Sequence, residues 1–444
     1  MLKEAIFILK RRLKGRKAIK KYKGSHAKIC RQIINSCFNG LFFQISTGNF
    51  ANFYIRDFGM CVRSLLKLGY KDEVYKTLTF ALSNYAEHGK VTTTITPVIS
   101  VFKANIMTDK SYQKNAANKK ISEKDYYDFI WGRNEHNHCR DFFDIAPDSL
   151  AFLLYSLRIS QSKALVSAYK PFLKRELNRY FEIIVDKETG LVKNINNIRK
   201  NSKNKGIYFS SIKDHAIRNS SCYDNCMLGM ISAEAKKLKL FDQETENPFA
   251  KFNYTELIKK YFWDVKKNRY GYFKDDLNNN VPTGDANVFP YWCGIFGIKG
   301  KNMSEEIKML NQSVKAIQNN GLDKPFPLKY SQHNPNRYGN FLFLPSLFAP
   351  NYEGNAVWMH LGLCYLDVIA DAAENMKNKK EKIYYKKLLK KYLNQYTKQI
   401  NIYNNFLEVY SVDKQDKQAK PYTSLFYLCD DSMLWCCKYL EMIK

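Results

Sequence analysis

An arginine and an aspartate stand side by side near the start of the chain, close to aromatic residues. Arg56 and Asp57 come just after Phe53 and Tyr54 and precede a strongly periodic apolar segment. Arginine offers a rigid fork of donors and aspartate offers only acceptors, so together they can bind two vicinal hydroxyls of a sugar while an aromatic face covers the ring. The same pair can be a salt bridge at a helix start, where the aspartate also suits the helix dipole.

The context of this pair resembles the start of the catalytic toroid in glucoamylases and related six-hairpin glycosidases. There, an aromatic-x-Arg-Asp element holds the sugar in the −1 subsite, and Tyr54 stands where the family usually has tryptophan. The resemblance continues through two predicted helices over 59–69 and 71–89 and an extended connection over 90–97. Asp148 then opens another predicted helix. This pattern covers most of the chain and implies an (α/α)6 toroid with glycosidase activity.

Hydrolysis of a glycosidic bond needs two carboxyl groups with different tasks. One protonates the leaving oxygen and the other activates water or attacks carbon, so their surroundings must separate their pKa values. For the acid we select Asp224, which begins a predicted inner helix after a long polar loop. The segment resembles the place where six-hairpin glycosidases present their general acid. The alternative is a helix cap, whose backbone donors would lower the pKa of this carboxyl.

For the base we select Glu408, which is flanked by Leu407 and Val409. The following residues are predicted to form a polar loop over 411–423 and a final apolar helix over 424–440. This order resembles the end of the glucoamylase domain. The alternative is a surface glutamate on a short strand, although apolar neighbours are less usual there.

Three further loops carry residues suited to a sugar pocket. Glu353 is a reserve carboxylate, and Gly354 beside it would let the backbone approach a ligand closely. Trp358 stands where related glycosidases line the pocket with tryptophan. Aromatic faces stack on the apolar side of a pyranose while carboxylates bind its hydroxyls. On these grounds, with a helix cap and a packed ring as the alternative, the other candidates are Asp148, Asp285 and Trp292.

Helical periodicity recurs along the chain, and strand-like alternation is scarce. Apolar residues at helical spacing predict inner helices around 150–157, 227–238 and 357–369. Long polar loops rich in glycine and asparagine, such as 275–284, separate them. Helix pairs joined alternately by short turns and long loops are typical of an α/α toroid. We therefore predict an all-α fold, a single (α/α)6 toroid.

No linker rich in Pro, Gly or Ser divides the chain, so we predict a basic N-terminal segment at 1–28 and one catalytic domain at 29–444. The net charge is +29, from 71 Lys and Arg against 42 Asp and Glu, which could suit a polyanion. The lysines are scattered, however, as an AT-rich genome would produce. The cluster at 377–391 has the spacing of a solvated helix face, and no nucleic-acid partner is expected.

The cysteines and the apolar segments indicate in which compartment of the cell the protein is found. The 11 cysteines lie largely inside apolar helical segments, which is typical of a reducing compartment. The short apolar stretch at 5–9 precedes its positive charges, unlike a secretory signal. No run of about eighteen apolar residues predicts a membrane span. We expect a cytoplasmic protein.

A His-x-His motif at His136 and His138, with Glu135 and Cys139 beside it, has zinc-type ligands. Cys139 has no second cysteine at standard spacing, so we expect no bound metal. Neither a glycine-rich phosphate loop nor a GxSxG motif is present, and no cofactor is implied.

These features predict an inverting glycosidase that cleaves a glucoside in an α-linked oligo- or polysaccharide. Asp224 would be the acid and Glu408 the base, with their carboxyl groups about 6.5 to 9.5 Å apart. Two alternatives stay open. One is a phosphorylase on the same toroid, in which phosphate replaces water, and the other is a non-catalytic scaffold that binds carbohydrate or a polyanion through its lysine-rich face.

Overall fold

The computed structural model describes residues 19–48, 50–96, 137–141, 145–193, 211–213, 219–265, 270–297, 303–332, 349–412, 419–424 and 427–444. Helices account for 56% of these residues. The described strands are two to four residues long and pair only in antiparallel fashion. The predicted all-α fold is confirmed.

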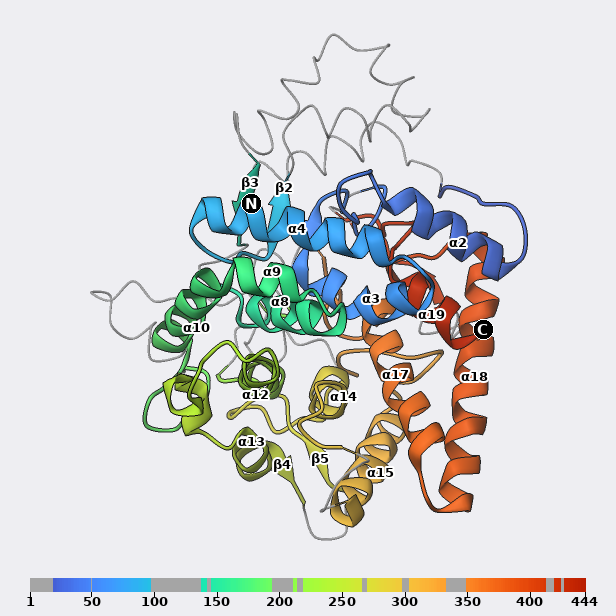
Figure 1. Ribbon diagram of the computed structural model, residues 1–444. Helices are drawn as coiled ribbons and strands as arrows, with labels where there is room; N and C mark the ends of the chain where they lie inside the picture. Colours follow the sequence, from blue (N-terminus) through green and yellow to red (C-terminus); the bar gives the residue numbers. More distant parts are fainter. Residues whose placement is uncertain are drawn as a thin grey trace.

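Within the described residues, six helices line the centre of the molecule, and each packs against the next to close a ring. In ring order they are α3 (Ile55–Lys67), α8 (Pro147–Ile159), α12 (Cys222–Lys237), α14 (Gly284–Trp292), α17 (Met359–Asn375) and α19 (Cys436–Met442). The last of them, α19, also packs on α3. Figure 1 shows two helices of this ring, α12 and α14, almost end-on. The inner helices are covered on two sides, and most residues of α8 and α12 are buried.

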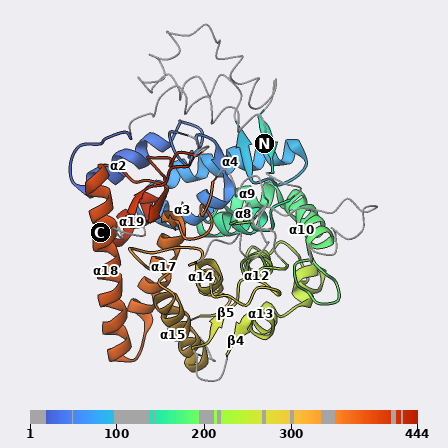
Figure 2. The same cartoon turned by 180° about the vertical axis from the view of Figure 1, so that it is seen from behind.

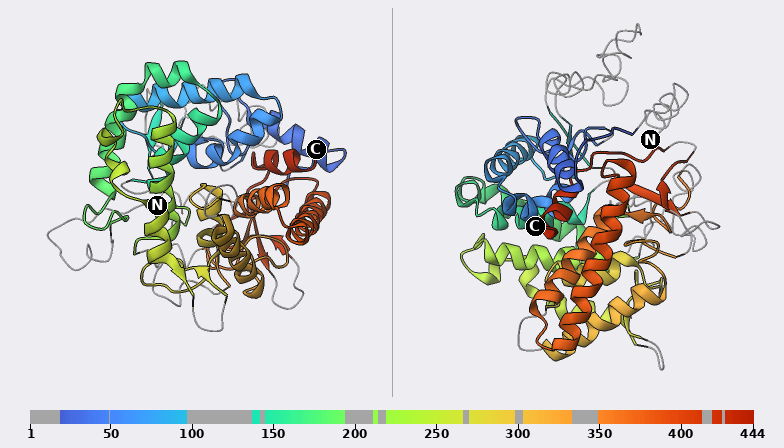
Figure 3. Two further views of the ribbon diagram at one scale, coloured as in Figure 1. Left: turned by 60° about the horizontal axis from the view of Figure 1, so that its bottom comes forward. Right: turned by 90° about the vertical axis from the view of Figure 1, so that its right-hand side faces the viewer.

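An outer layer surrounds the ring, and each outer helix contacts the inner helix that precedes it around the circle. The outer helices are α4 (Lys71–His88), α10 (Lys170–Ile184), α13 (Tyr254–Phe262), α15 (Met303–Asn319), α18 (Lys379–Tyr403) and α2 (His26–Cys37). Figures 1 and 2 show the layer from two sides, and Figure 3 shows α18 running along the periphery. The short helices α9 (Lys163–Ala168), η1 (Glu244–Glu246) and η2 (Pro248–Lys251) lie in connections. Six inner and six outer helices make the predicted (α/α)6 toroid.

Short sheets lead into two of the inner helices. β1 (Phe53–Tyr54) pairs with β2 (Thr94–Thr96), which pairs with β3 (His138–Arg140), and β1 runs directly into α3. β6 (Val357–Trp358), β7 (Val409–Val412) and β8 (Ala419–Pro421) form a second sheet, and β6 runs directly into α17. β4 (Trp263–Asp264) pairs with β5 (Tyr272–Phe273). The first two sheets therefore lie at the end of the ring where α3 and α17 begin.

Glycine lets two inner helices approach each other closely. A Cβ atom at Gly59 of α3 would lie 2.6 Å from Cδ1 of Phe152 in α8. Real Cβ atoms are not found at such distances from a packed ring, so this contact requires glycine. The sequence thus specifies a tight α3–α8 seam.

The prediction of one final helix over 424–440 is wrong, because α19 covers only Cys436–Met442. The backbone before it pairs with the segment of Glu408: Glu408 N–H donates to the Asp430 carbonyl at 3.1 Å, and Asp430 N–H donates to the Glu408 carboxylate at 2.9 Å. This pairing keeps the chain extended there. For α3 the predicted helix was too short, since the helix begins at Ile55, four residues before its predicted start.

The predicted boundary at residue 28 lies inside α2, which begins at His26. Residues 1–18, which hold much of the basic segment, lie outside the described residues. Tyr22 already contacts the rest of the toroid, since its N–H donates to the Asn404 carbonyl at 2.9 Å and its hydroxyl lies 3.0 Å from Ser432 Oγ. No helix that the structure describes is both long and apolar enough to cross a membrane.

Candidate active site

The first turns of three inner helices meet through a buried ion pair. Arg56 of α3 donates its Nε–H to Asp148 of α8, with an N–O distance of 2.5 Å. Tyr223 of α12 donates its hydroxyl to the same carboxylate oxygen at 2.8 Å. Asp148 is therefore a shared acceptor, and Arg56 pairs across helices as well as lying next to Asp57.

The other three inner helices join at the same place. Trp435, the residue before α19, donates its indole N–H to Asp57 at 3.1 Å, and its ring lies 4.7 Å from that of His360 in α17. Lys213 lies 3.0 Å from Asp285 of α14 and 5.5 Å from the Tyr330 ring. The Tyr330 hydroxyl lies 3.1 Å from His360 Nε2. All six first turns thus surround one opening of the ring, which we call the toroid mouth.

Aromatic residues occupy three of the six N-cap positions at the toroid mouth. Tyr54 precedes α3, Trp358 precedes α17 and Trp435 precedes α19, and in the described structure none of them makes a capping hydrogen bond through its side chain. Ser, Thr, Asp and Asn stabilise this position best, typically by about 1 kcal/mol relative to residues that cannot cap. Departures from local rules of this kind are expected at functional sites.

Nine of the ten predicted site residues lie at or next to the toroid mouth. Four are the aspartates in the first turns of α3, α8, α12 and α14: Asp57, Asp148, Asp224 and Asp285. Tyr54, Arg56 and Trp358 belong to the starts of α3 and α17. Glu408 is connected to Trp358 through Tyr352, whose ring packs edge-on against the Trp358 ring at 4.6 Å and whose hydroxyl donates to Glu408 at 2.7 Å. Glu353 follows Tyr352 in the chain.

Trp292 does not belong to this group. It ends α14, and its indole N–H donates to Asp367 at 2.9 Å. Because an α-helix rises about 1.5 Å per residue, Asp367 lies about 12 Å along α17 from the start of that helix. The Trp292 ring also packs on Phe152 and Tyr155 in α8. The predicted place of Trp292 beside the sugar is therefore corrected to the interior of the ring.

Asp224 is not the cap of α12. Ser221 is the N-cap residue, and its hydroxyl accepts the Asp224 N–H at 3.0 Å and donates to the carboxylate at 2.6 Å. Ser211 donates to the other carboxylate oxygen at 2.7 Å. Hydroxyls can either donate or accept. Ser211 can therefore satisfy this carboxyl with or without its proton.

Glu408 is completely buried just before β7. The hydroxyl of Tyr427 lies 2.7 and 2.8 Å from its two oxygens, and Tyr352 and Asp430 N–H supply further donors. These donors lower the pKa of Glu408, but burial outweighs them. With the nearby charge of Asp430, burial raises the pKa of Glu408 to about 8.

Several mouth residues escaped the sequence prediction. Tyr352 contacts Glu408 but was not selected, whereas its neighbour Glu353 in the same loop was. Tyr427 was hidden within the wrongly predicted helix over 424–440. Lys213, His360 and Trp435 carry no local motif, and only the packing of distant segments brings them to the mouth. The aromatic cap positions are the one signal that could have found Trp435.

The His-x-His motif lies only partly within the described residues. No group of three or more His, Cys, Asp or Glu residues there is arranged to bind a metal. Glu135 and His136 lie outside the described residues. Burial raises the pKa of the Cys139 thiol to about 12.

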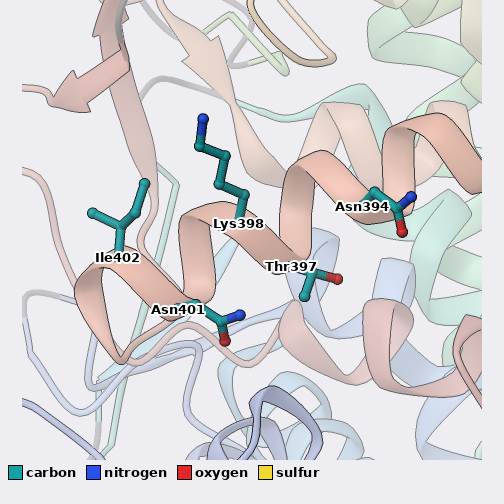
Figure 4. Close-up of a pocket in the computed structure, with 5 residues that line it drawn as sticks. All are labelled: Asn394, Thr397, Lys398, Asn401 and Ile402. Carbon is teal, nitrogen blue, oxygen red and sulfur yellow. The ribbon is translucent and has the colours of Figure 1, made fainter.

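A surface hollow lies on the last turns of the outer helix α18 (Figure 4). It is lined by Asn394, Thr397, Lys398, Asn401 and Ile402. This lining has neither a carboxylate nor an aromatic ring, so it lacks the groups that glycoside hydrolysis needs. The lysines of α18 before it face solvent, as predicted for the cluster at 377–391.

The sequence matches no protein-family model and no curated protein. Among solved structures, a GH63 mannosylglycerate hydrolase from Thermus thermophilus in complex with Tris is 10% identical, with a TM-score of 0.55 over 94% of this chain and 100% of that chain. A rhamnosidase from Klebsiella oxytoca with rhamnose bound is 10% identical, with a TM-score of 0.54 over 96% of this chain. A GH78 rhamnosidase of a Bacillus species is 13% identical, with a TM-score of 0.53 over 96% of this chain.

The chain spans 65% of the Klebsiella rhamnosidase and 35% of the Bacillus rhamnosidase. Similarity at this level of identity shows a shared fold. The chain therefore has the fold of the six-hairpin glycosidases, and no particular resemblance to glucoamylases follows.

Proposed function

We propose that this protein is an inverting glycoside hydrolase whose active site is the toroid mouth. The observation that carries this proposal is the combination of two buried carboxyl groups, Asp224 and Glu408, with aromatic rings at N-cap positions. Rings that cannot cap a helix can cover the apolar face of a sugar. The fold is shared with a rhamnosidase and a mannosylglycerate hydrolase, which supports the glycosidase activity in this proposal.

We assign Asp224 as the general acid. It can retain a proton without losing its partners, because Ser211 can accept as readily as it can donate. In the reaction it would protonate the leaving glycosidic oxygen. Arg56, fixed by Asp148, and Asp57, fixed by Trp435, would bind hydroxyls of the −1 sugar. Tyr54, Asp285, Glu353 and Trp358 would complete the pocket.

We assign Glu408 as the base, although its pKa is raised to about 8 in the structure. Desolvation is the largest cause of this rise in pKa. The attacking water would hydrate the carboxyl group and so remove part of the desolvation. The donors from Tyr352, Tyr427 and Asp430 N–H remain, and they favour the ionised form. Once ionised, Glu408 would accept a proton from water as the water attacks the anomeric carbon.

The substrate we propose is an α-linked glucoside. Structures of the same fold contain glucose, and others act on or contain different sugars, so the fold permits several. The side chains at the mouth are mostly buried, with Glu408 at 0% and Asp224 at 4% exposure. A substrate therefore enters through a more open arrangement of the mouth.

The test uses two substitutions that preserve volume, Asp224→Asn and Glu408→Gln, assayed on α-linked gluco-oligosaccharides and aryl α-glucosides. General acid or base catalysis contributes about 10² to 10⁴ in rate, so each variant should lose at least a hundredfold in kcat. Asp242→Asn and Glu374→Gln make the same changes on exposed residues and should retain full activity. A loss below tenfold in either mouth variant would remove that residue from the mechanism.

Two further outcomes would replace the proposal. Proton NMR of the first product should show the inverted anomer, and release of the retained anomer would exclude a water-activating base. If Glu408→Gln stops hydrolysis while added phosphate supports phosphorolysis, the enzyme is a phosphorylase. Binding of oligosaccharide without turnover by the wild type would indicate a non-catalytic scaffold.

A further inference from the structure

His360 lies at the toroid mouth and has no part in the mechanism above. It is the second residue of α17 and is 6% exposed. Its ring lies between two indoles, 5.0 Å from Trp358 and 4.7 Å from Trp435. Trp435 in turn binds Asp57. His360 thus adjoins the side chains that we assign to the sugar.

The hydrogen bonds around Tyr330 determine which ring nitrogen of His360 carries the proton. The Tyr330 hydroxyl lies 3.1 Å from the Ile212 carbonyl oxygen and 3.1 Å from His360 Nε2. A carbonyl oxygen can only accept, so the single phenol proton goes to Ile212. His360 Nε2 must then be the donor to the phenol oxygen. The neutral imidazole therefore carries its proton on Nε2, and Nδ1 has a free lone pair.

His360 Nδ1 is buried and has no hydrogen-bond partner among the residues that the structure describes. Leaving a buried acceptor unpaired costs about 1 to 3 kcal/mol. Protonation does not resolve this, since burial, with the charges of Arg56 and Lys438, lowers the pKa of His360 to about 3. The ring stays neutral across the working range, and Nδ1 stays an acceptor.

We propose that His360 Nδ1 accepts a hydrogen bond from a substrate hydroxyl, which makes His360 a sugar-binding residue of the mouth. This inference rests on the proposed function to the extent that the mouth binds a sugar. The chain from Nε2–H to Tyr330 and on to Ile212 orients the imidazole and fixes its tautomer. Its bonds also polarise one another, which strengthens Nδ1 as an acceptor.

The surroundings select a neutral donor. Arg56 and Lys438 are close enough to disfavour a positive charge on the ring, so they also disfavour an ammonium group or a metal ion at Nδ1. A sugar hydroxyl is neutral, and the indoles of Trp358 and Trp435 beside the ring suit the apolar faces of a pyranose. The opening that exposes Asp224 and Glu408 to substrate must extend to Nδ1.

The test compares two amides that replace different nitrogens of the imidazole. His360→Gln can keep a donor near Nε2 for Tyr330 but has no acceptor at the δ position, whereas His360→Asn keeps an acceptor oxygen there. Glucose, mannose and rhamnose serve as probes, and binding is followed by tryptophan fluorescence and saturation-transfer NMR. For the sugar that binds wild type best, His360→Gln should weaken binding about tenfold, the upper range for one neutral hydrogen bond. His360→Asn should stay within about threefold of wild type.

Monodeoxy analogues of that sugar identify the hydroxyl. One analogue should bind wild type about tenfold more weakly than the parent sugar and lose nothing further with His360→Gln. In parallel, nitrogen-15 NMR of the imidazole should show Nδ1 unprotonated in the free protein and shifted by the sugar. His360→Gln serves to identify this signal among the 7 histidines.

Each outcome is decisive for the inference. It is overturned if His360→Gln binds the sugar like wild type, if no deoxy position is coupled to His360, if Nδ1 carries the proton, or if wild type binds none of the three sugars. Failure of the proposed function looks different. Sugar binding would then still depend on His360, whereas turnover would either be unchanged in Asp224→Asn and Glu408→Gln or be absent from wild type and all variants. Hydrolysis that requires Asp224 and Glu408 but ignores His360 would overturn only this inference.

Discussion

The surroundings of Glu408 shift its pKa in opposite directions. Burial is the largest influence and raises its pKa, while a backbone N–H and two phenols favour the carboxylate. By itself a raised pKa would suit an acid, since an acid must carry a proton at working pH. The donors around Glu408 lead us to the base instead, and the dependence of activity on pH separates the two assignments.

We predict that kcat/KM, which reports the free enzyme, rises with pH up to about 8. Below this pKa Glu408 binds a proton and cannot take one from water, so activity should fall about tenfold for each pH unit on the acidic side. The measurement is kcat/KM on an aryl glucoside between pH 5 and 9. A profile that falls as pH rises through 8 would make Glu408 the acid and Asp224 the base.

At the scale of the elements, neighbouring inner helices pack closely against each other. α3 and α8 meet at Gly59, where Phe152 occupies the space of a Cβ atom. The contact also fixes the first turns that carry Arg56 and Asp148, which lie in the same two helices. Packing and site geometry are therefore coupled at this seam.

We predict that Gly59→Ala lowers the free energy of unfolding by about 1 to 3 kcal/mol, the usual cost of overpacking. Alanine favours a helix more than glycine does, so a loss of stability would show that the clash with Phe152 dominates. Urea denaturation measures the effect, and Ser83→Ala on the exposed face of α4 should change stability by less than about 0.5 kcal/mol. A more stable Gly59→Ala protein would mean that the two helices are not tightly packed.

Local pattern predicted the elements whose signals are local. Apolar spacing located α8, α12 and α17, and α4 ends within one residue of its prediction because Gly89 adopts the left-handed conformation that ends a helix. The stretch before α19 has enough apolar residues to resemble a helix in sequence, yet its pairing with the segment of Glu408 keeps it extended. A partner some twenty residues away in the chain cannot be read from periodicity, so that helix was predicted too long.

The candidate site divides in the same way. The aspartates at helix starts were found because position along the chain is enough to place them. Trp292 was misplaced because the sequence does not show how far α14 extends before its last residue meets Asp367. Lys213, His360 and Trp435 were missed, since only closure of the ring brings them to the mouth.

For the whole molecule, closure of the ring depends on contacts of the last helix. Lys438 of α19 forms a buried ion pair with Asp367 of α17 and donates to the Met60 carbonyl of α3 at 3.0 Å. The Lys438 side chain thus binds α19 to both of its neighbours in the ring, α17 and α3. The charges of Asp367 and Lys438 sustain each other: the pKa of Asp367 is lowered and that of Lys438 is raised by the pairing, which outweighs the effect of burial.

We predict that Lys438→Met lowers the free energy of unfolding by about 3 to 5 kcal/mol, because it leaves Asp367 buried without its closest cation. Lys67→Met makes the same change at an exposed pair with Glu441 and should cost less than about 1 kcal/mol. Urea denaturation of both variants provides the comparison. Lys438→Met combined with Asp367→Leu should recover part of the loss, since replacing both members of a buried pair with apolar residues is often neutral or stabilising. The recovery stays partial because Arg63 and the Trp292 indole N–H also bind Asp367. Equal effects of the two Lys→Met changes would show that the buried pair does not hold the ring closed, and closure would then rest on the apolar contacts of α19 with α2 and α3.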